Sequence, residues 1–176
     1  MITPAYARMM AAYNAEMNRR TYATAAGLTD AERRADHRAF WGSIHGTLSH
    51  ILWGDRIWMS RFAGWPKPTQ EMRDSPALHE NFDQLRAARE VADSGIIAWA
   101  EGLDQAWLDQ DLVWYSGVLQ SEVRRPRVVV VTHFFNHQAH HRGQVHAMLT
   151  AHGRDTGDTD LPIVLRDLER AGRAPS

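Results

Sequence analysis

Apolar residues recur every three to four positions in four long segments of the chain, the spacing by which an α-helix buries one face. The four helices that this pattern predicts span residues 4–25, 38–62, 76–101 and 126–152. In the last of them the repeat runs through Val130, Phe134, His137, His141, Gln144 and Met148. Two histidines are therefore expected to face the interior of the protein.

Residues that favour helix ends flank these segments. Thr3 and Ser75 each precede a proline, and proline suits a first helical position because its missing N–H needs no partner there. Pro126 and Gly153 mark the two ends of the last segment in a similar way. The residues expected on the buried side of the second helix are Phe40, Ile44, Leu48, Ile51, Trp58 and Phe62.

The shorter segments predict smaller elements. Thr29 and Glu32 have the spacing of a capping box, which indicates a short turn of helix. Residues 104–108 are expected to form another turn, and Asp160 is expected to cap a last short helix. Between these, the runs LVWYS and VLQSEVRR are separated near Gly117, which indicates a short β-hairpin or an extended loop.

Together these elements predict an all-α fold, a bundle of four long helices with a short hairpin or extended loop before the fourth helix. The chain is long enough for one proper core. We therefore expect a single domain over residues 1–170 and a disordered tail over residues 171–176.

Composition narrows the classes of function. Of the 176 residues, 44% are hydrophobic and 23% are charged, and the formal net charge of −1 argues against binding to nucleic acid or an anionic membrane. The chain has no cysteine, so any metal must be held by nitrogen and oxygen, and any thiol must come from a small molecule. Because neither a signal peptide nor a membrane-spanning run is recognisable, we expect a cytoplasmic protein.

Six of the ten histidines fall in the last predicted helix. His137 and His141 are four residues apart, so a rise of ~6 Å places both imidazoles on the same side of the helix, where they can share one metal ion. Core or surface histidines can have the same spacing without binding metal. His133 and His137 are also four residues apart, so the spacing alone leaves the pair of ligands open.

His50 is the candidate for a third ligand. It lies beside the apolar stripe of the second predicted helix, with Gly46 one turn before it and Gly54 one turn after it. Glycine costs ~1 kcal/mol in a helix interior relative to alanine, so two flanking glycines indicate close approach by another segment. The alternative is a histidine hydrogen-bonded in the core, and His45 is a weaker candidate for the same role.

The chain resembles the DinB family of the DinB/YfiT superfamily of bacterial helical-bundle proteins. The segments that carry the resemblance are SIHGTLSHILWGDRIWMSRF, FFNHQAHHRGQVHAMLTAHG and the trailing DTDLPIVL. The resemblance implies an up-down-down-up four-helix bundle, a homodimer, and a divalent metal held by His50, His137 and His141. It also makes His133 the weaker candidate, because His137 and His141 precede the Arg-Gly-Gln run of the family pattern.

The superfamily includes enzymes that use low-molecular-weight thiols. The first hypothesis is therefore an enzyme, of the thiol S-transferase or hydrolase type, in which Zn, Ni, Fe or Mn activates a small-molecule thiol or water as nucleophile. The second is a non-catalytic metal-binding stress-response module, in which a fourth protein ligand closes the site. His133, His140 and His45 are the candidates for that fourth ligand.

Three further polar residues stand near these positions in the sequence. Asp55 and Asn136 are candidates to orient the imidazoles through hydrogen bonds, but the expectation favoured for each is a solvated or helix-pairing role. Arg142 is expected to pair with an acidic residue such as Asp55 or Asp160. None of them is a convincing general base.

Overall fold

The computed structural model describes residues 2–174, which are mostly helical with one small antiparallel sheet. The elements are, in chain order, α1 (Pro4–Ala26), α2 (Asp30–Arg34), α3 (Ile44–Phe62), the 3₁₀ helix η1 (Met72–Ala77), α4 (Phe82–Glu101), α5 (Gln105–Leu108), β1 (Asp111–Ser116), β2 (Ser121–Pro126), α6 (Arg127–Ala151) and α7 (Leu161–Arg170).

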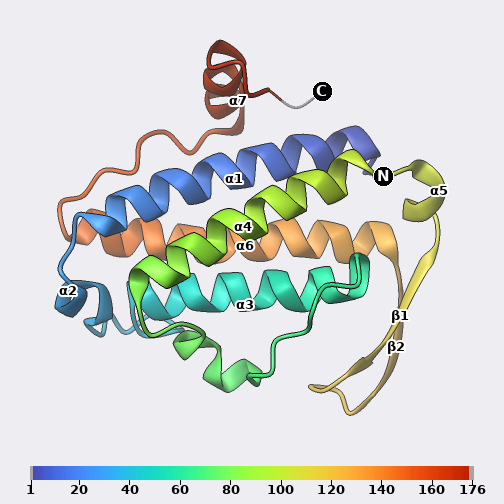
Figure 1. The fold of residues 1–176 in the computed structure, drawn as a ribbon, viewed down its shortest axis with the longest axis horizontal. Coiled ribbons are helices and arrows are strands. Elements are labelled where there is room, and N and C mark those ends of the chain that lie inside the picture. Colours follow the sequence, from blue (N-terminus) through green and yellow to red (C-terminus); the bar gives the residue numbers. More distant parts are fainter. Residues whose placement is uncertain (1, 175–176) are drawn as a thin grey trace.

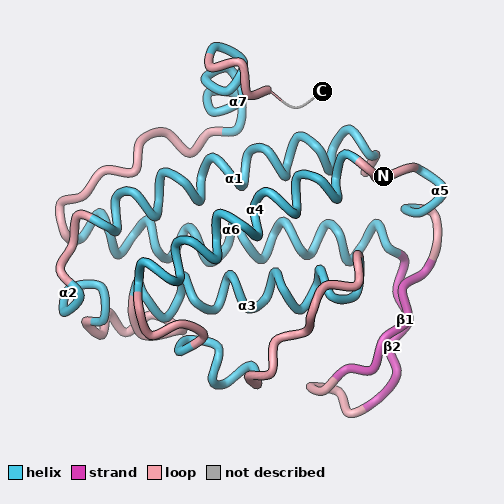
Figure 2. Tube along the Cα trace, in the orientation of Figure 1, coloured by secondary structure: helices cyan, strands magenta, loops and turns pink. Residues whose placement is uncertain are grey.

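The long helices α1, α3, α4 and α6 lie side by side (Figure 1). α1 packs against α4 and α6, and α3 packs against the same two helices from the other side. The colours in Figure 1 show that α1 and α6 run in one direction while α3 and α4 run in the opposite one. The β1–β2 hairpin extends from one end of this group, and α7 packs on the outside of α1 (Figure 2).

The second long helix begins later than the sequence pattern predicts, at Ile44. Arg38 and Gly42 have φ angles of 56° and 74°, which are incompatible with a right-handed helix. The side chain of Ser43 then accepts a hydrogen bond from the backbone N–H of Gly46 and caps the helix. Phe40 lies in the preceding turn with 78% of its surface exposed, so its predicted place in the core was wrong.

The start of the third long helix also differs from the prediction. Ser75 and Pro76 belong to the short helix η1 and do not begin the long helix. α4 starts at Phe82, where the side chain of Asn81 accepts hydrogen bonds from the next backbone N–H groups. Because Ser75 does not cap α4, its side chain is available for a hydrogen bond with His50 of α3.

The other predicted elements agree with the structure. The capping box of Thr29 and Glu32 is formed, Asp104 caps α5, and the hairpin turns at residues 117–120. α7 follows Asp160. Of the tail expected over residues 171–176, the last two positions lie outside the described residues, as does Met1.

A polar layer crosses the middle of the helical group. On α6, the apolar cluster at one end uses residues 128–135, and the cluster at the other end uses residues 145–149. Between them lie side chains that carry charge or ring nitrogens, and the facing helices contribute others at the same level. The buried members of this layer include Asn14, Asn18, His50, Asp55, Arg89, Gln138, His141 and Arg142.

Candidate metal centre

Three histidines converge in the polar layer, His50 from α3 and His137 and His141 from α6. One potential ligand nitrogen from each ring can be chosen so that all three lie within 4.8 Å of one another. The Nε2 atoms of His50 and His137 are 3.0 Å apart. The structure therefore brings together the three positions that the family resemblance singled out.

Gly46 allows η1 to approach α3 beside this cluster. A Cβ atom at this position would lie 2.6 Å from the carbonyl oxygen of Trp41 and 3.3 Å from the Cβ of Pro76. A side chain there would push both segments outward. The close approach expected from this glycine is thus present, and it brings Ser75 next to His50.

Ser75 fixes the tautomer of His50. The Ser75 hydroxyl donates its one hydrogen to the carbonyl oxygen of Met72 at 2.6 Å, so it can only accept from Nδ1 of His50, 2.8 Å away. The proton of His50 is therefore on Nδ1, and Nε2 carries the free lone pair. The sequence contained no local signal for this role, because Ser75 resembled a helix cap.

Gln144 has the corresponding role for His141. Its side-chain oxygen Oε1 lies 2.8 Å from Nδ1 of His141 and accepts the proton there. This again leaves Nε2 as the nitrogen with a free lone pair. Residues three apart on a helix are neighbours, so the pair could have been found from the spacing of the two residues.

His137 is the ring of the three whose two nitrogens are not both satisfied by hydrogen bonds. Its Nδ1 atom is buried without a partner, and its Nε2 atom faces the unprotonated Nε2 of His50. Either tautomer leaves a lone pair or an N–H without its normal partner, and a buried polar atom in that state costs free energy. A cation between the Nε2 atoms would use the lone pairs, so the donor set fits a divalent metal.

Burial keeps these rings in the form that binds metal. Burial first, and then the neighbouring His137 and His141, lower the pKa of His50 to about 3. Burial lowers the pKa of His137 to about 3 as well, and also lowers the pKa of His141. At neutral pH the three imidazoles are therefore uncharged and available as ligands.

The other candidate histidines lie outside the cluster. His133 is exposed and contacts the ring of Trp58, and His140 is exposed on α6. Nε2 of His45 is hydrogen-bonded to the carbonyl oxygen of His79 at 2.7 Å. Within the described part of the chain, the group of His, Asp and Glu donors at this point consists of His50, His137 and His141.

The polar residues expected around the site have other partners. Asp55 accepts a hydrogen bond from Arg89 of α4 at 2.5 Å and is fully buried, while Asn136 is exposed. Arg142 does not form the expected ion pair with Asp55 or Asp160. Its guanidinium donates instead to the side-chain oxygens of Asn14 and Gln138.

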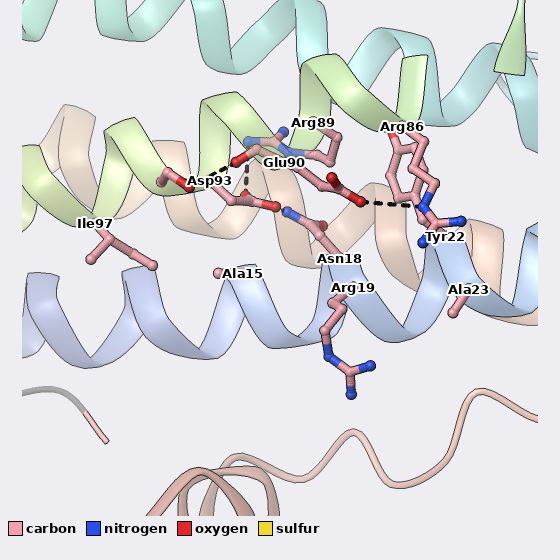
Figure 3. Close-up of a pocket in the computed structure, with 11 residues that line it drawn as sticks. Ala15, Asn18, Arg19, Tyr22, Ala23, Arg86, Arg89, Glu90, Asp93 and Ile97 are labelled. Carbon is pink, nitrogen blue, oxygen red and sulfur yellow. Dashed lines mark hydrogen bonds and ion pairs between the residues drawn. The ribbon is translucent and has the colours of Figure 1, made fainter. Parts of the chain in front are cut away.

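A separate cavity of about 440 Å³ lies between α1 and α4 (Figure 3). Its wall includes Arg89 and Asp93, whose charged groups are 2.9 Å apart, and Asn18 of α1 donates to Asp93 at 2.9 Å. These groups hold α1, α3 and α4 together through Asp55. The residues that line the cavity come from α1 and α4, whereas the three histidines lie on α3 and α6, so we assign these groups to helix packing.

The fold and the three histidines place this protein among helical proteins with a possible histidine metal site in the interior. The DinB family model matches residues 1–170, so the chain belongs to the DinB family. A search of curated proteins finds no significant match. In the described residues, no helix is long and apolar enough to cross a membrane.

Proposed function

We propose that this DinB-family protein binds one divalent transition metal through Nε2 of His50, His137 and His141, and that it is a metal-dependent enzyme. The reaction class we propose is thiol S-transfer or hydrolysis, with a small-molecule thiol or water as the nucleophile. Such an ion, when bound, would lower the pKa of that nucleophile. Zn, Ni, Fe and Mn all accept imidazole ligands.

The observation that carries this proposal is the donor set. Among the described residues, the three neutral imidazoles are not joined by a fourth His, Asp or Glu donor, which leaves coordination positions for a substrate, as in catalytic sites. His137 is partly exposed, whereas only 3% of His50 and 7% of His141 is exposed. The side of the cluster at His137 is therefore where we place the entry of a ligand.

The roles of the chain's own residues follow from their contacts. His50, His137 and His141 bind, and Ser75 and Gln144 hold two of these rings in the required tautomer. Trp41 stacks on His50 with ring centroids 3.9 Å apart and excludes water from that face. The chain has no cysteine, so a thiol nucleophile would be a separate small molecule.

The proposal also includes the bundle topology and the oligomeric state that the family resemblance implies, together with the cellular location. The directions of α1, α3, α4 and α6 are those of an up-down-down-up bundle, and we propose that this is the DinB-type topology. We also propose a cytoplasmic homodimer. The near-neutral net charge of −1 supports a protein that does not bind nucleic acid.

A second candidate function is a non-catalytic metal-binding stress-response module. The burial of His50 and His141 favours it, because an ion there would fasten α3 to α6 and add its binding free energy to folding. The two candidates differ in whether a small molecule can reach the ion.

Elemental analysis of untagged protein purified without chelators tests the ligand set. We expect about one transition metal ion per chain, lost in His141→Ala and in His137→Ala/His141→Ala. The matched control is His140→Ala, which removes an exposed histidine next to the site and should retain the ion. Stoichiometric metal in the double variant would contradict the proposed ligands.

Spectroscopy of the Ni²⁺-loaded protein then separates the two functions. A catalytic site should change its absorption when 2-mercaptoethanol is added, because the thiol enters an open coordination position. An unchanged spectrum, together with no thiol transfer or ester hydrolysis, would favour the non-catalytic module.

A further inference from the structure

A second pair of histidines meets away from the proposed centre. His37 lies in the connection between α2 and α3, and His152 lies at the end of α6. They are 115 residues apart in sequence, yet their Nε2 atoms are 3.2 Å apart and their ring centroids 5.0 Å apart. Both side chains are only partly buried, so the pair can be reached from solvent.

Ordered backbone fixes the position of His37. Its N–H donates to the carbonyl oxygen of Gly42 at 2.8 Å. The N–H of Gly42 in turn donates to the carbonyl oxygen of Ala39 at 2.8 Å. Gly42 has a φ of 74°, so the turn depends on glycine at this position. The ring of His37 is thus held on a closed turn.

The end of α6 fixes His152 in a comparable way. Its N–H donates to the carbonyl oxygen of Leu149 at 3.0 Å, and the N–H of Arg154 donates to the same oxygen at 3.0 Å. Gly153 has a φ of 67°, the left-handed conformation that ends many helices. Backbone hydrogen bonds therefore fix the main chain from which each of the two rings extends.

The distance suits two ligands of one ion. Nitrogens ~2.1 Å from a metal stand about 3.0 Å apart at a right angle and about 3.4 Å apart at a tetrahedral angle. The Nε2 atoms of His37 and His152, at 3.2 Å, lie between these values, close to the 3.0 Å of His50 and His137. In the absence of an ion, the same pair can share one proton as an N–H···N hydrogen bond.

The charges around the pair are mixed. Glu32 of α2 is near enough to His152 to interact with it: hydrogen bonds from Thr29 lower the pKa of Glu32 first, and His152 and Arg154 lower it further. One carboxylate oxygen of Glu32 remains outside the capping box, which uses Oε2. The positive charge of Arg154 disfavours a cation nearby. Its guanidinium, however, is held by a hydrogen bond to the carbonyl oxygen of Gly27.

We propose that His37 and His152 form a second metal site, which takes a Ni²⁺, Zn²⁺ or Cu²⁺ ion with water in the remaining positions. These ions accept imidazole nitrogen. With two protein ligands the site is weaker and faster to exchange than the three-histidine centre. Its ion ties the turn before α3 to the end of α6. The proposal does not depend on the proposed function, because the two sites share no residue.

Equilibrium dialysis of the full chain against NiCl₂, followed by elemental analysis, tests this site. The wild type should take up about two ions per chain, and His137→Ala/His141→Ala about one. Adding His37→Ala or His152→Ala to that double variant should abolish the remaining uptake. Adding His140→Ala, which removes an exposed histidine of the same helix, should leave it unchanged.

If the double variant fails to fold, as judged by circular dichroism, the wild type is compared with His37→Ala and His152→Ala alone. Each single variant should lose the weaker equivalent and keep the tighter one. Uptake that is equal in the wild type and both variants would overturn the second site and reduce the pair to a hydrogen bond. If the double variant folds, its loss of the tight equivalent with retention of the weak one would support the two sites separately.

Discussion

The imidazole of His137 occupies the space that a side chain on Gly54 would need. A Cβ atom at position 54 would lie 2.8 Å from Cε1 of His137 and 3.3 Å from its Nδ1. Real Cβ atoms do not approach ring atoms this closely, so only glycine allows α3 and α6 to meet at this level. The backbone of α3 thus forms one wall of the space around the ring.

The Gly54→Ala variant should therefore bind metal more weakly while remaining folded. Alanine favours the helix by ~1 kcal/mol relative to glycine, whereas overpacking costs about 1–3 kcal/mol, so the net loss of stability is small. Displacement of the His137 ring should weaken metal binding by about tenfold or more, as disturbance of the surroundings of a ligand does. Isothermal titration with Ni²⁺ measures the change.

Gly143→Ala is the matched control for this variant. Gly143 also lies within a long helix, but a Cβ atom there would meet no other atom within 4 Å. Alanine should raise the free energy of unfolding by up to ~1 kcal/mol and leave the metal affinity as it is. Equal affinities for Gly54→Ala and Gly143→Ala would show that the approach of His137 to α3 does not matter for binding.

Replacing Ser75 should weaken metal binding without removing a ligand. The Ser75→Ala variant deletes the acceptor that holds the proton of His50 on Nδ1, so Nε2 is no longer kept free. We expect the metal affinity to fall by about 10–100-fold. Ser94→Ala removes an exposed hydroxyl that bonds to the carbonyl oxygen of Glu90 and should have no effect. A wild-type affinity in Ser75→Ala would exclude a role for this hydroxyl.

The stability of the chain should depend on pH through Glu16. Its carboxylate is 2.8 Å from Arg19, 2.8 Å from Arg20 and 3.1 Å from Arg173. The hydrogen bond from Arg19, opposed by burial and supported by Arg20, lowers the pKa of Glu16 to about 2. Because the folded pKa lies below the unfolded value, this contribution is complete above pH ~4.5 and is lost as the pH falls toward 2.

Glu16→Gln should accordingly lower the free energy of unfolding at pH 7 by roughly 1–2 kcal/mol, since two of the partner arginines are exposed and partly screened. Urea unfolding at pH 7 and near pH 3 should show that the difference from wild type shrinks in acid. Glu90→Gln, which breaks an exposed pair with Arg86, should change stability by at most ~0.5 kcal/mol. A difference for Glu16→Gln that stays constant with pH would contradict this assignment.

The buried ion pair of Arg89 and Asp55 should be far more sensitive than the surface pairs. Only 2% of the Arg89 side chain and 1% of the Asp55 side chain is exposed. Arg89→Met leaves the carboxylate of Asp55 buried without its partner and should destabilise the fold by about 3–5 kcal/mol. Arg86→Met, one turn earlier on the solvent face of α4, should cost less than ~0.5 kcal/mol. Thermal unfolding followed by circular dichroism distinguishes the two.

Periodicity and caps predicted most of the helices because these signals act within a few residues. Two predicted helix starts were wrong. The apolar pattern continues through Phe40, and Ser75–Pro76 has the residues of a helix start. The left-handed turn at Gly42 and the cap at Asn81 nevertheless decide where these two helices begin. Spacing found a histidine pair on the fourth helix, but it could not choose among His133, His137 and His141.

The remaining features of the site depend on contacts between distant segments. Ser75 meets His50 across 25 residues, Asp55 finds Arg89 across 34, and His37 meets His152 across 115. No local pattern encodes which polar group will face which in the interior. The helix-pairing role that the sequence favoured for Asp55 is thus present, but its partner Arg89 could not be named from the sequence.

Two indole rings flank the first of the three histidines. The ring of Trp41 stacks on His50 at 23° to the imidazole plane, and the ring of Trp53 lies at 24° to that plane with its centroid 5.9 Å from that of His50. Open-shell ions such as Ni²⁺ and Cu²⁺ quench indole emission at such short range, whereas Zn²⁺ does not. The protein therefore carries a built-in optical reporter, and the arrival, departure and exchange of an ion can be followed in a stopped-flow fluorimeter without any label.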